Sequence, residues 1–253
     1  MPGLAQVRRM EAVSFRSFPA TSTFYDGSWA IRLTAGHPAK RLNSVSPLDP
    51  SDHANIDARV EMAQHRFDSF GRRLVFRLSP LSPCELDDVL DDRGWDYFDE
   101  TIVMVADLEE HSFSDAMDQL PLQDVGLWVD AYLALSEMDD DNKPGLAEVI
   151  GAIKPVSGLF ITQNEDNDPI SALRCVQDND LAGLFDVVTN TRLRGRGHGR
   201  ASVLSALKWA VKMGAETGWL QVVADNEAAL KLYQSLGFRE LYRYTYRAAP
   251  QTP

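Results

Sequence analysis

The sequence predicts an α+β (mixed α/β) fold in which a mixed, mostly antiparallel sheet is flanked by helices. Apolar segments at 158–163, 170–177 and 181–190 follow one another with only short turn-rich segments between them, which is typical of an antiparallel meander. A glycine-rich loop and an amphipathic helix come next, and a strand, a helix and a last strand are expected over 219–246. A meander before the glycine-rich loop argues against a parallel dinucleotide-binding sheet.

The N-terminal half shows a similar mixture of short strands and helices. Loose alternation of apolar residues predicts strands at 29–33 and 42–48, joined by a turn-prone segment at 36–38. The first 25 residues show no clear periodicity, and we expect an irregular arm there. The other elements expected before the meander are a helix ending at Gly71, a strand at 73–78, a helix ending at Gly94, a strand at 101–108, and helices around 128–135 and 146–153.

A polar stretch at 109–118, rich in Glu, Ser and Asp, is the predicted boundary between two halves. We therefore expect an irregular arm at 1–25, an N-terminal domain at 26–112 and a C-terminal domain at 119–253. Each half is long enough to bury a core of its own.

The composition narrows the class of partner. With 25 Lys and Arg against 37 Asp and Glu, the formal net charge is -12, so phosphate backbones and anionic lipid surfaces would be repelled. We therefore expect no nucleic acid and no membrane as partner. The opening segment matches neither a secretory signal nor a membrane span, which predicts a cytoplasmic protein. Cys84 and Cys175 lie far apart and the five histidines lack ligand spacing, so no metal site is expected.

The segment Arg194-Gly195-Arg196-Gly197-His198-Gly199-Arg200 lies between a predicted strand and a predicted helix. Glycines there allow a tight turn whose N–H groups close on a pyrophosphate at the positive end of the following helix. A Walker loop would need a Gly-Lys-Ser/Thr ending, and the dinucleotide fingerprint a small residue in place of Arg200. Charge alone also fits a solvated loop.

These residues resemble the acyl-CoA signature of the GCN5-related N-acetyltransferase (GNAT) superfamily. Its pattern is Arg or Gln, two residues, Gly, one residue, Gly or Ala, and Arg194, Gly197 and Gly199 match it in register. A second segment also resembles the family, through Asn226, Ala229, Leu232-Tyr233 and Leu236-Gly237-Phe238. The resemblance is close over 181–247 and looser from Trp128 onward, and it implies the GNAT fold and acetyl-CoA as the acetyl donor.

Carried over onto this sequence, the resemblance implies a set of cofactor contacts. Backbone groups of Val187, Val188 and Thr189 would pair with the pantetheine arm, as in strand addition by a ligand. Asn226 would bond the pantetheine or its phosphate end. The pyrophosphate would be held by the loop amides, with charge-assisted contacts from Arg194 or Arg196. The loop residues concerned are Arg194, Gly195, Arg196, Gly197, His198, Gly199 and Arg200.

Two residues are candidates for proton transfer. Tyr233 stands where the family commonly places a phenol near the cofactor sulfur, which implies a general acid for the leaving thiolate. It could equally be an ordinary core residue of an amphipathic helix. Asp186 lies one residue from the expected pantetheine contacts and is a candidate base for the acceptor ammonium. The alternative for Asp186 is a strand-end carboxylate in water or in a salt bridge.

The resemblance implies an N-acetyltransferase that moves an acetyl group from acetyl-CoA to a primary amine by direct attack in a ternary complex. The acceptor is left open as a small molecule, an amino acid derivative or a peptide or protein amine. Acidic groups such as those at 139–141 favour a cationic acceptor, although they also suit an ordinary surface. The alternative function is a noncatalytic acyl-CoA-binding module, and an oligomer remains possible.

The N-terminal half carries an echo of the second motif. The order of helix, Gly94, Trp95 and strand over 86–108 is similar to that over 230–246, with its Gly237 and Phe238. This half is therefore interpreted as a degenerate GNAT-like copy in tandem with the C-terminal domain. Because it has no Arg/Gly loop, we expect it to bind no CoA.

Overall fold

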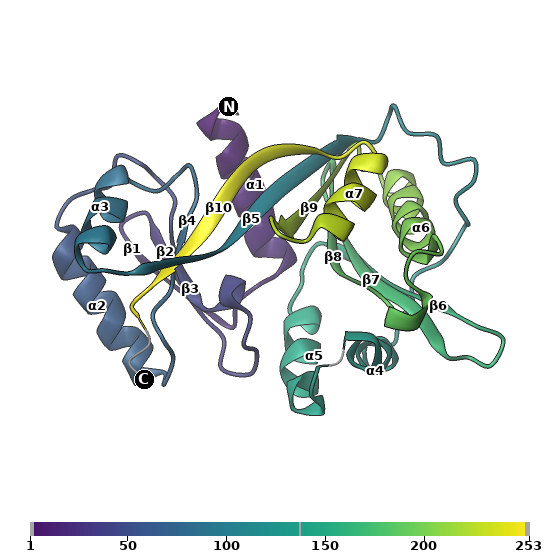
Figure 1. Ribbon diagram of the computed structural model, residues 1–253, viewed down its shortest axis with the longest axis horizontal. Helices are drawn as coiled ribbons and strands as arrows, with labels where there is room; N and C mark the ends of the chain where they lie inside the picture. Colours follow the sequence, from purple (N-terminus) through teal and green to yellow (C-terminus); the bar gives the residue numbers. More distant parts are fainter. Residues whose placement is uncertain (1–2, 137, 251–253) are drawn as a thin grey trace. The chain divides into compact units, whose positions relative to one another are not determined.

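The computed structural model describes residues 3–136 and 138–250 (Figure 1). The chain forms two compact units. The first comprises Met1–Val103, Val222–Asn226 and Glu240–Pro253, and the second comprises Met104–Gln221 and Glu227–Arg239. The end of the chain is therefore part of the first unit. Whether 26–112 and 119–253 fold as separate domains stays a prediction.

The first unit is built on five strands in the order β1-β2-β3-β4-β10, followed by the start of β5. The pairs β1–β2, β2–β3 and β4–β10 are antiparallel, and β3–β4 is parallel. The strands are β1 (Ser22–Asp26), β2 (Trp29–Leu33), β3 (Ser44–Pro47), β4 (Phe76–Leu78), β5 (Asp96–Asp107) and β10 (Arg239–Ala248). The helices are α1 (Leu4–Ser17), η1 (Lys40–Leu42), α2 (Ile56–Ser69) and α3 (Cys84–Asp92).

The second unit holds the predicted meander, with strands in the order β9-β8-β7-β6. The pairs β6–β7 and β7–β8 are antiparallel, and β8–β9 is parallel. The strands are β6 (Val156–Gln163), β7 (Pro169–Asp178), β8 (Leu181–Thr189) and β9 (Thr217–Val223). The helices are α4 (Val125–Ser136), η2 (Asp140–Asn142), α5 (Lys143–Gly151), η3 (Thr191–Leu193), α6 (His198–Lys212) and α7 (Glu227–Ser235).

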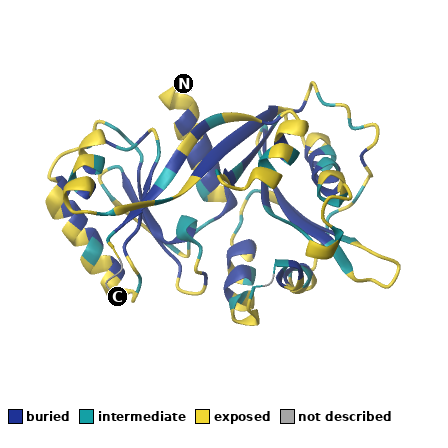
Figure 2. Ribbon diagram, in the orientation of Figure 1, coloured by how far each residue is buried: buried dark blue, intermediate teal, exposed yellow. Residues whose placement is uncertain are grey.

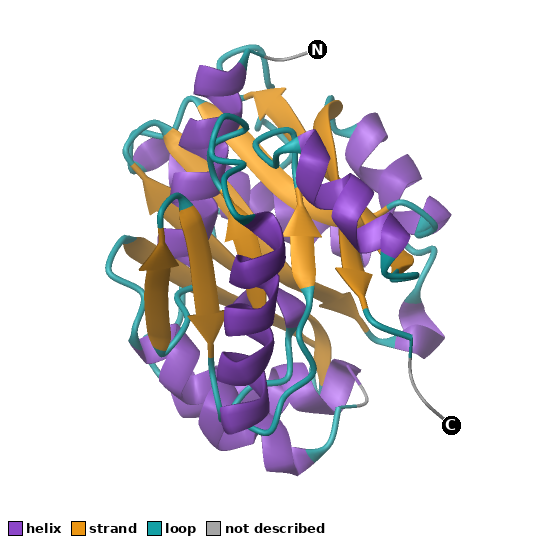
Figure 3. Cartoon of the chain, turned by 90° about the vertical axis from the view of Figure 1, so that its left-hand side faces the viewer, coloured by secondary structure: helices purple, strands orange, loops and turns teal. Residues whose placement is uncertain are grey.

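Helices α4 and α6 both contact the sheet of the second unit. Figure 3 shows the helices and strands of the chain by type. Trp128 of α4 and Ile150 of α5 pack in one cluster with Ala172 of β7. The neighbouring residue, Ser171, contacts α6 instead, and successive residues of a strand point to opposite faces. The predicted fold class, a mostly antiparallel sheet flanked by helices, is therefore confirmed.

The prediction of an irregular arm at 1–25 is wrong for the described residues. Leu4–Ser17 forms helix α1, and Ser22–Asp26 forms β1. Val7, Met10 and Val13 of α1 are buried at helical spacing, and Glu11 between them is also buried. Figure 2 shows that this helix has both buried and exposed parts. Burial of a charged residue hides the periodicity in the sequence, because a charge is normally taken to mark the solvent side.

No helix among the described residues is long and apolar enough to cross a membrane.

Candidate functional site

The site begins with a bulge in β8. Arg174 of β7 pairs with Phe185 and Ala172 pairs with Val188, so Asp186 and Val187 share a single opposing residue. Asp186 has a φ of 55°, in the left-handed region, as expected where an extra residue bends a strand. The parallel register of β8 with β9 runs from Leu181↔Thr217 to Leu184↔Leu220, before the bulge.

The end of β8 therefore extends beyond its last pair with β9, Leu184↔Leu220. Val187, Val188 and Thr189 are all half-buried, and they lie past the last β8–β9 pair. Backbone groups on that side of an extended strand can pair with an extended ligand. Val187, Val188 and Thr189 are the residues that the resemblance implies for the pantetheine arm. They therefore lie on a part of β8 to which an extended ligand can pair.

The Arg/Gly loop connects β8 to α6 through η3. The Asn190 side chain accepts a hydrogen bond from the Arg192 N–H at 3.0 Å and so starts the turn. Gly195 and Gly197 have φ of +75° and +85°, which side chains with a Cβ rarely adopt. Arg192, Arg194 and Arg196 are exposed along the loop.

Main-chain N–H groups gather where the loop becomes α6. The first turn of α6 is closed by the Ala201 N–H, which donates to the Gly197 carbonyl at 3.0 Å. His198, Gly199 and Arg200 precede Ala201, and N–H groups of a first helical turn have no carbonyl within the helix to bond. The helix dipole adds partial positive charge at this end. The local backbone therefore suits an anion such as a diphosphate.

Gly199 brings the start of α6 against the end of β8. A Cβ built on Gly199 would lie 3.1 Å from Thr189 Oγ1 and 3.7 Å from Leu232 Cδ2 of α7. Arg194 Nε donates to the Thr189 carbonyl at 3.3 Å. The structure thus brings the predicted strand end and the predicted loop together, with the helix that bears Tyr233 beside them.

Tyr233 is buried on α7. Its side chain is 7% exposed and makes an edge contact with Phe238, with ring centroids 5.9 Å apart. Burial raises the pKa of the Tyr233 phenol to about 12, because the phenolate would be poorly solvated. At neutral pH the group therefore holds its proton and can give up a proton but cannot serve as a base. Packing of this kind also fits an ordinary core tyrosine.

Two further predicted residues lie at the ends of helices. The Arg200 guanidinium donates to the Ser235 carbonyl at 3.3 Å and to Ser235 Oγ at 3.1 Å, so its side chain holds the C-terminal end of α7. The main-chain N–H of Arg200 belongs to the first turn of α6. The guanidinium is therefore engaged by α7, and only this N–H lies at the start of α6. Asn226 directly precedes α7 and belongs to the first unit, where its N–H donates to the Val223 carbonyl at 3.0 Å.

Comparison with known proteins identifies the family. Residues 4–247 match the family described as "Probable histone acetyltransferase Rv0428c C-terminal". The "Uncharacterized N-acetyltransferase YobR" of Bacillus subtilis is 28% identical over 250 residues, which covers 95% of this chain and 98% of that protein. This protein is a member of the GCN5-related N-acetyltransferases.

Other proteins resemble this GNAT protein over part of its sequence or share its fold. The "[Ribosomal protein bS18]-alanine N-acetyltransferase" of Escherichia coli is 36% identical over 80 residues, which is 32% of this chain and 53% of that enzyme. A "GCN5-related N-acetyltransferase from Kribbella flavida" has a TM-score of 0.71 at 15% identity, covering 97% and 96% of the two chains. A "Tandem GNAT protein from the clavulanic acid biosynthesis pathway" has a TM-score of 0.65 at 14% identity, covering 96% and 88%. These two structures establish the shared fold.

The site of this GNAT protein also contains Arg174, a residue that the sequence motifs did not indicate. Arg174 of β7 is fully buried, and its guanidinium contacts Asp186 Oδ2 through Nε at 2.9 Å and Nη2 at 2.8 Å. The Asp186 side chain is 11% exposed. An ion pair at the bulge fits the structural alternative for Asp186, and its role as a base stays a prediction. The signal for Arg174 in the sequence is a charged residue inside an otherwise apolar strand.

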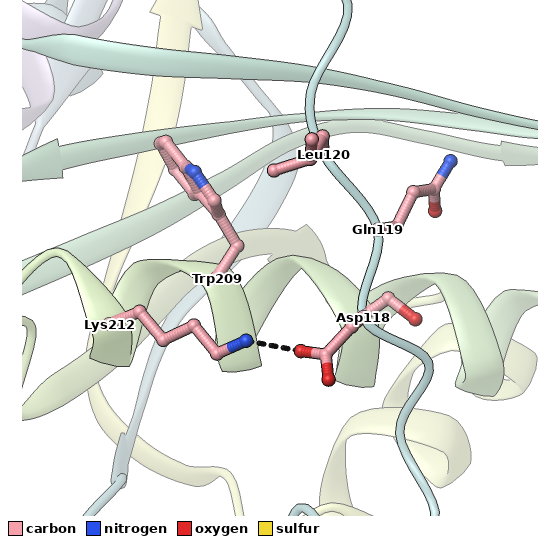
Figure 4. Close-up of a pocket in the computed structure, with 6 residues that line it drawn as sticks. Asp118, Gln119, Leu120, Trp209 and Lys212 are labelled. Atoms are coloured by element: carbon pink, nitrogen blue, oxygen red, sulfur yellow. Dashed lines mark hydrogen bonds and ion pairs between the residues drawn. The ribbon is translucent and has the colours of Figure 1, made fainter.

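A small pocket in this GNAT fold lies away from the predicted site residues (Figure 4). It is formed where the segment 118–120 crosses α6, with Trp209 and Lys212 on the helix side and an ion pair between Lys212 and Asp118. None of the predicted cofactor contacts lines it. The pocket is therefore not the CoA site that the family motif predicts.

Proposed function

We propose that this GNAT protein transfers an acetyl group from acetyl-CoA to a primary amine by direct attack in a ternary complex. One observation carries the proposal: a glycine loop with left-handed φ values opens α6 directly beside the end of β8, which pairs with β7 but lies past its last pair with β9. A diphosphate at the loop and an extended pantetheine arm along β8 would satisfy both features together. The thioester would then lie on the β8 side of α7, which bears Tyr233.

Each residue has a stated task in this proposal. Bound acetyl-CoA would supply the activated acetyl carbonyl. N–H groups from Gly195 to Arg200 hold the diphosphate, and the exposed Arg194 and Arg196 side chains add positive charge. Backbone groups of Val187 to Thr189 align the arm, which converts the reaction into an attack within one complex. The acceptor ammonium would first lose a proton to a base or to water, and its nitrogen would then attack the acetyl carbonyl. As the C–S bond breaks, Tyr233, protonated at neutral pH, would donate its proton to the departing sulfur, and the second proton lost by the nitrogen would restore the phenol.

The acceptor that we propose is a cationic amine, either a small molecule or a peptide or protein amine. Asp140 and Asp141 are exposed in η2, between α4 and α5. Both helices pack in the cluster that also contacts Val188 of the proposed cofactor strand. Negative charge on this helix pair would raise the local concentration of a cation near the thioester. One relative is named for acetylating a protein alanine, which keeps peptide amines in the acceptor class.

Consumption of the thioester tests the proposal. The chain would be mixed with acetyl-CoA and a panel of primary amines, and the release of free thiol would be followed. Amine-dependent release, with the acetylated amine identified by mass spectrometry, supports the enzyme. Tight CoA binding without turnover on any amine supports the alternative, a noncatalytic acyl-CoA-binding module. A chain whose melting temperature does not change with CoA contradicts both functions.

A further inference from the structure

A row of hydroxyl side chains crosses the meander under the start of α6. Thr162 of β6 pairs with Ser171 of β7, and Ser171 pairs with Thr189 of β8. Residues paired across neighbouring strands point to the same face of a sheet. Ser171 and Thr189 both approach α6, through Ser202 and Gly199 respectively, so this row lies on the face that α6 covers.

Ser202 of α6 lies over this row and bonds to it. Ser202 Oγ is 2.6 Å from Ser171 Oγ and 3.2 Å from Thr162 Oγ1. Ser202 and Ser171 are 5% and 1% exposed, so water does not replace these contacts. Around them the buried face of α6 is mostly apolar, with Val203, Ala206 and Leu207 fully buried. Apolar contacts are non-directional, whereas hydrogen bonds fix distance and orientation.

The hydroxyl contact lies one helical turn from the Arg/Gly loop. Gly197 caps α6 and Gly199 rests on Thr189, so Ser202 provides a second attachment of the same turn to the sheet. Two attachments fix where the N–H groups of His198 to Arg200 stand relative to Val187–Thr189. A diphosphate and a pantetheine arm of one molecule are joined covalently, which limits their separation, so the spacing matters for a ligand bound at both places.

We infer that Ser202 is a positioning residue, which, through Ser171 and Thr162, sets the register between the diphosphate-binding turn of α6 and the pantetheine strand. The inference rests on the proposed function. Ser202 itself is too deeply buried to touch the ligand, so it acts only through the placement of α6. Its removal should weaken ligands that contact both the loop and the strand, and spare ligands that contact the strand alone.

The variants Ser202→Ala, Ser171→Ala and their combination test this inference. Each single variant should weaken CoA binding about 3- to 10-fold, as expected when one buried hydroxyl contact is lost. The double variant should bind CoA no more weakly than Ser202→Ala, because Ser202→Ala already removes the contact with Ser171 together with the one to Thr162. Ser205→Ala is the matched control: Ser205 is 2% exposed one turn further along α6 and lines the separate pocket. Its CoA affinity should stay within about 2-fold of wild type.

Two readouts separate positioning from general damage. Turnover of S-acetylpantetheine, which lacks the diphosphate, should be unchanged in Ser202→Ala while the KM for acetyl-CoA rises. Amides of 199–203 should exchange hydrogen faster in ligand-free Ser202→Ala than in Ser205→Ala. Equal losses with both donors, or a CoA affinity equal to wild type, would overturn the inference. A wild-type chain that binds CoA but acetylates no amine would contradict the proposed function, and the CoA affinities would still decide the role of Ser202.

Discussion

Two strand-to-helix junctions in this chain differ in the groups that surround the start of the helix. In the first unit, β3 leads into α2 through an acidic segment in which Asp52 accepts hydrogen bonds from Ser28 N–H at 2.8 Å and from Arg59 Nη1 at 2.9 Å. In the second unit, β8 leads into α6 through glycines and exposed arginines. In the first junction, side chains of the chain itself, such as Asp52 and Arg59, bond to one another. In the second, backbone N–H groups at the start of the helix face solvent.

The difference bears on the proposed ligand site, because a helix start can accept a ligand only where the chain does not fill it. Arg59 is held by Asp26 and Asp52, and its side chain is 8% exposed, so this arginine is committed to the fold. A diphosphate approaching this junction would also meet the carboxylates of Asp49 and Asp52. The contrast supports the expectation that the N-terminal half binds no CoA.

The largest expected effect is on the stability of the first unit. Arg77 forms a buried ion pair with Glu11, whose Oε1 also accepts a hydrogen bond from Tyr242 at 2.6 Å. Glu11→Gln leaves a buried guanidinium without its counter-charge and should lower the free energy of unfolding by about 3–5 kcal/mol. Urea unfolding measures this. The control, Glu240→Gln, breaks an exposed pair with Arg243 and should cost no more than about 1 kcal/mol. Equal losses would show that the buried pair has no special role.

The next effect concerns the glycine loop. Gly197→Val places a β-branched residue at a φ of +85° and should weaken CoA binding about 1,000-fold, through loss of about three charge-assisted N–H contacts. The matched control is Gly214→Val, which has the same strain at a φ of +95° just beyond α6. It should lose stability but keep its CoA affinity, as calorimetric titration would show. Equal weakening by both variants would mean that strain, and not the loop, is responsible.

A smaller effect should distinguish two buried tyrosines. Tyr233→Phe should lower kcat about 100-fold while the Kd for CoA stays within about 2-fold, because only the proton donor is removed. Tyr242 is also buried, but its hydroxyl bonds to Glu11 in the first unit. Tyr242→Phe should therefore reduce stability by about 1 kcal/mol and leave kcat unchanged. If kcat were unchanged in Tyr233→Phe, this residue would be an ordinary core tyrosine.

The smallest effect concerns the acidic junction and depends on pH. The hydrogen bonds from Arg59 and then Ser28 lower the pKa of Asp52 to about 2. Because the folded pKa is lowered, the stabilisation is present above the unfolded pKa of about 3.9 and is lost as the pH falls toward 2. Asp52→Asn should cost about 1–2 kcal/mol at pH 7, discounted because the side chain is 26% exposed. Unfolding curves at pH 7, 4 and 3 should show the difference shrinking. A constant difference would exclude this titration as its source.

Local patterns were enough to predict much of the second unit. The segments 158–163, 170–177 and 181–190 correspond closely to β6, β7 and β8, because apolar runs and turn residues determine a meander over short distances. The loop was recognisable for the same reason, since Gly195 and Gly197 are needed by the local backbone. Its role in binding CoA stays a prediction.

Long-range features could not be predicted. Helix α1 depends on Arg77, a distant residue that neutralises its buried Glu11. The pairing of β10 with β4, at Thr245↔Leu78, is likewise absent from any local pattern. In the candidate site, the contact of Arg174 with Asp186 depends on the cross-strand register and on the bulge in β8. A single sequence carries no direct information on such register.

The most direct test of the account is hydrogen exchange of the wild-type chain with and without CoA. Bound CoA should slow exchange of the backbone amides from Gly195 to Arg200 and of those at the end of β8, while the amides between β3 and α2 stay unchanged. Binding that protects other segments and leaves the amides of 195–200 exchanging at their ligand-free rate would contradict the assignment of the diphosphate to this loop.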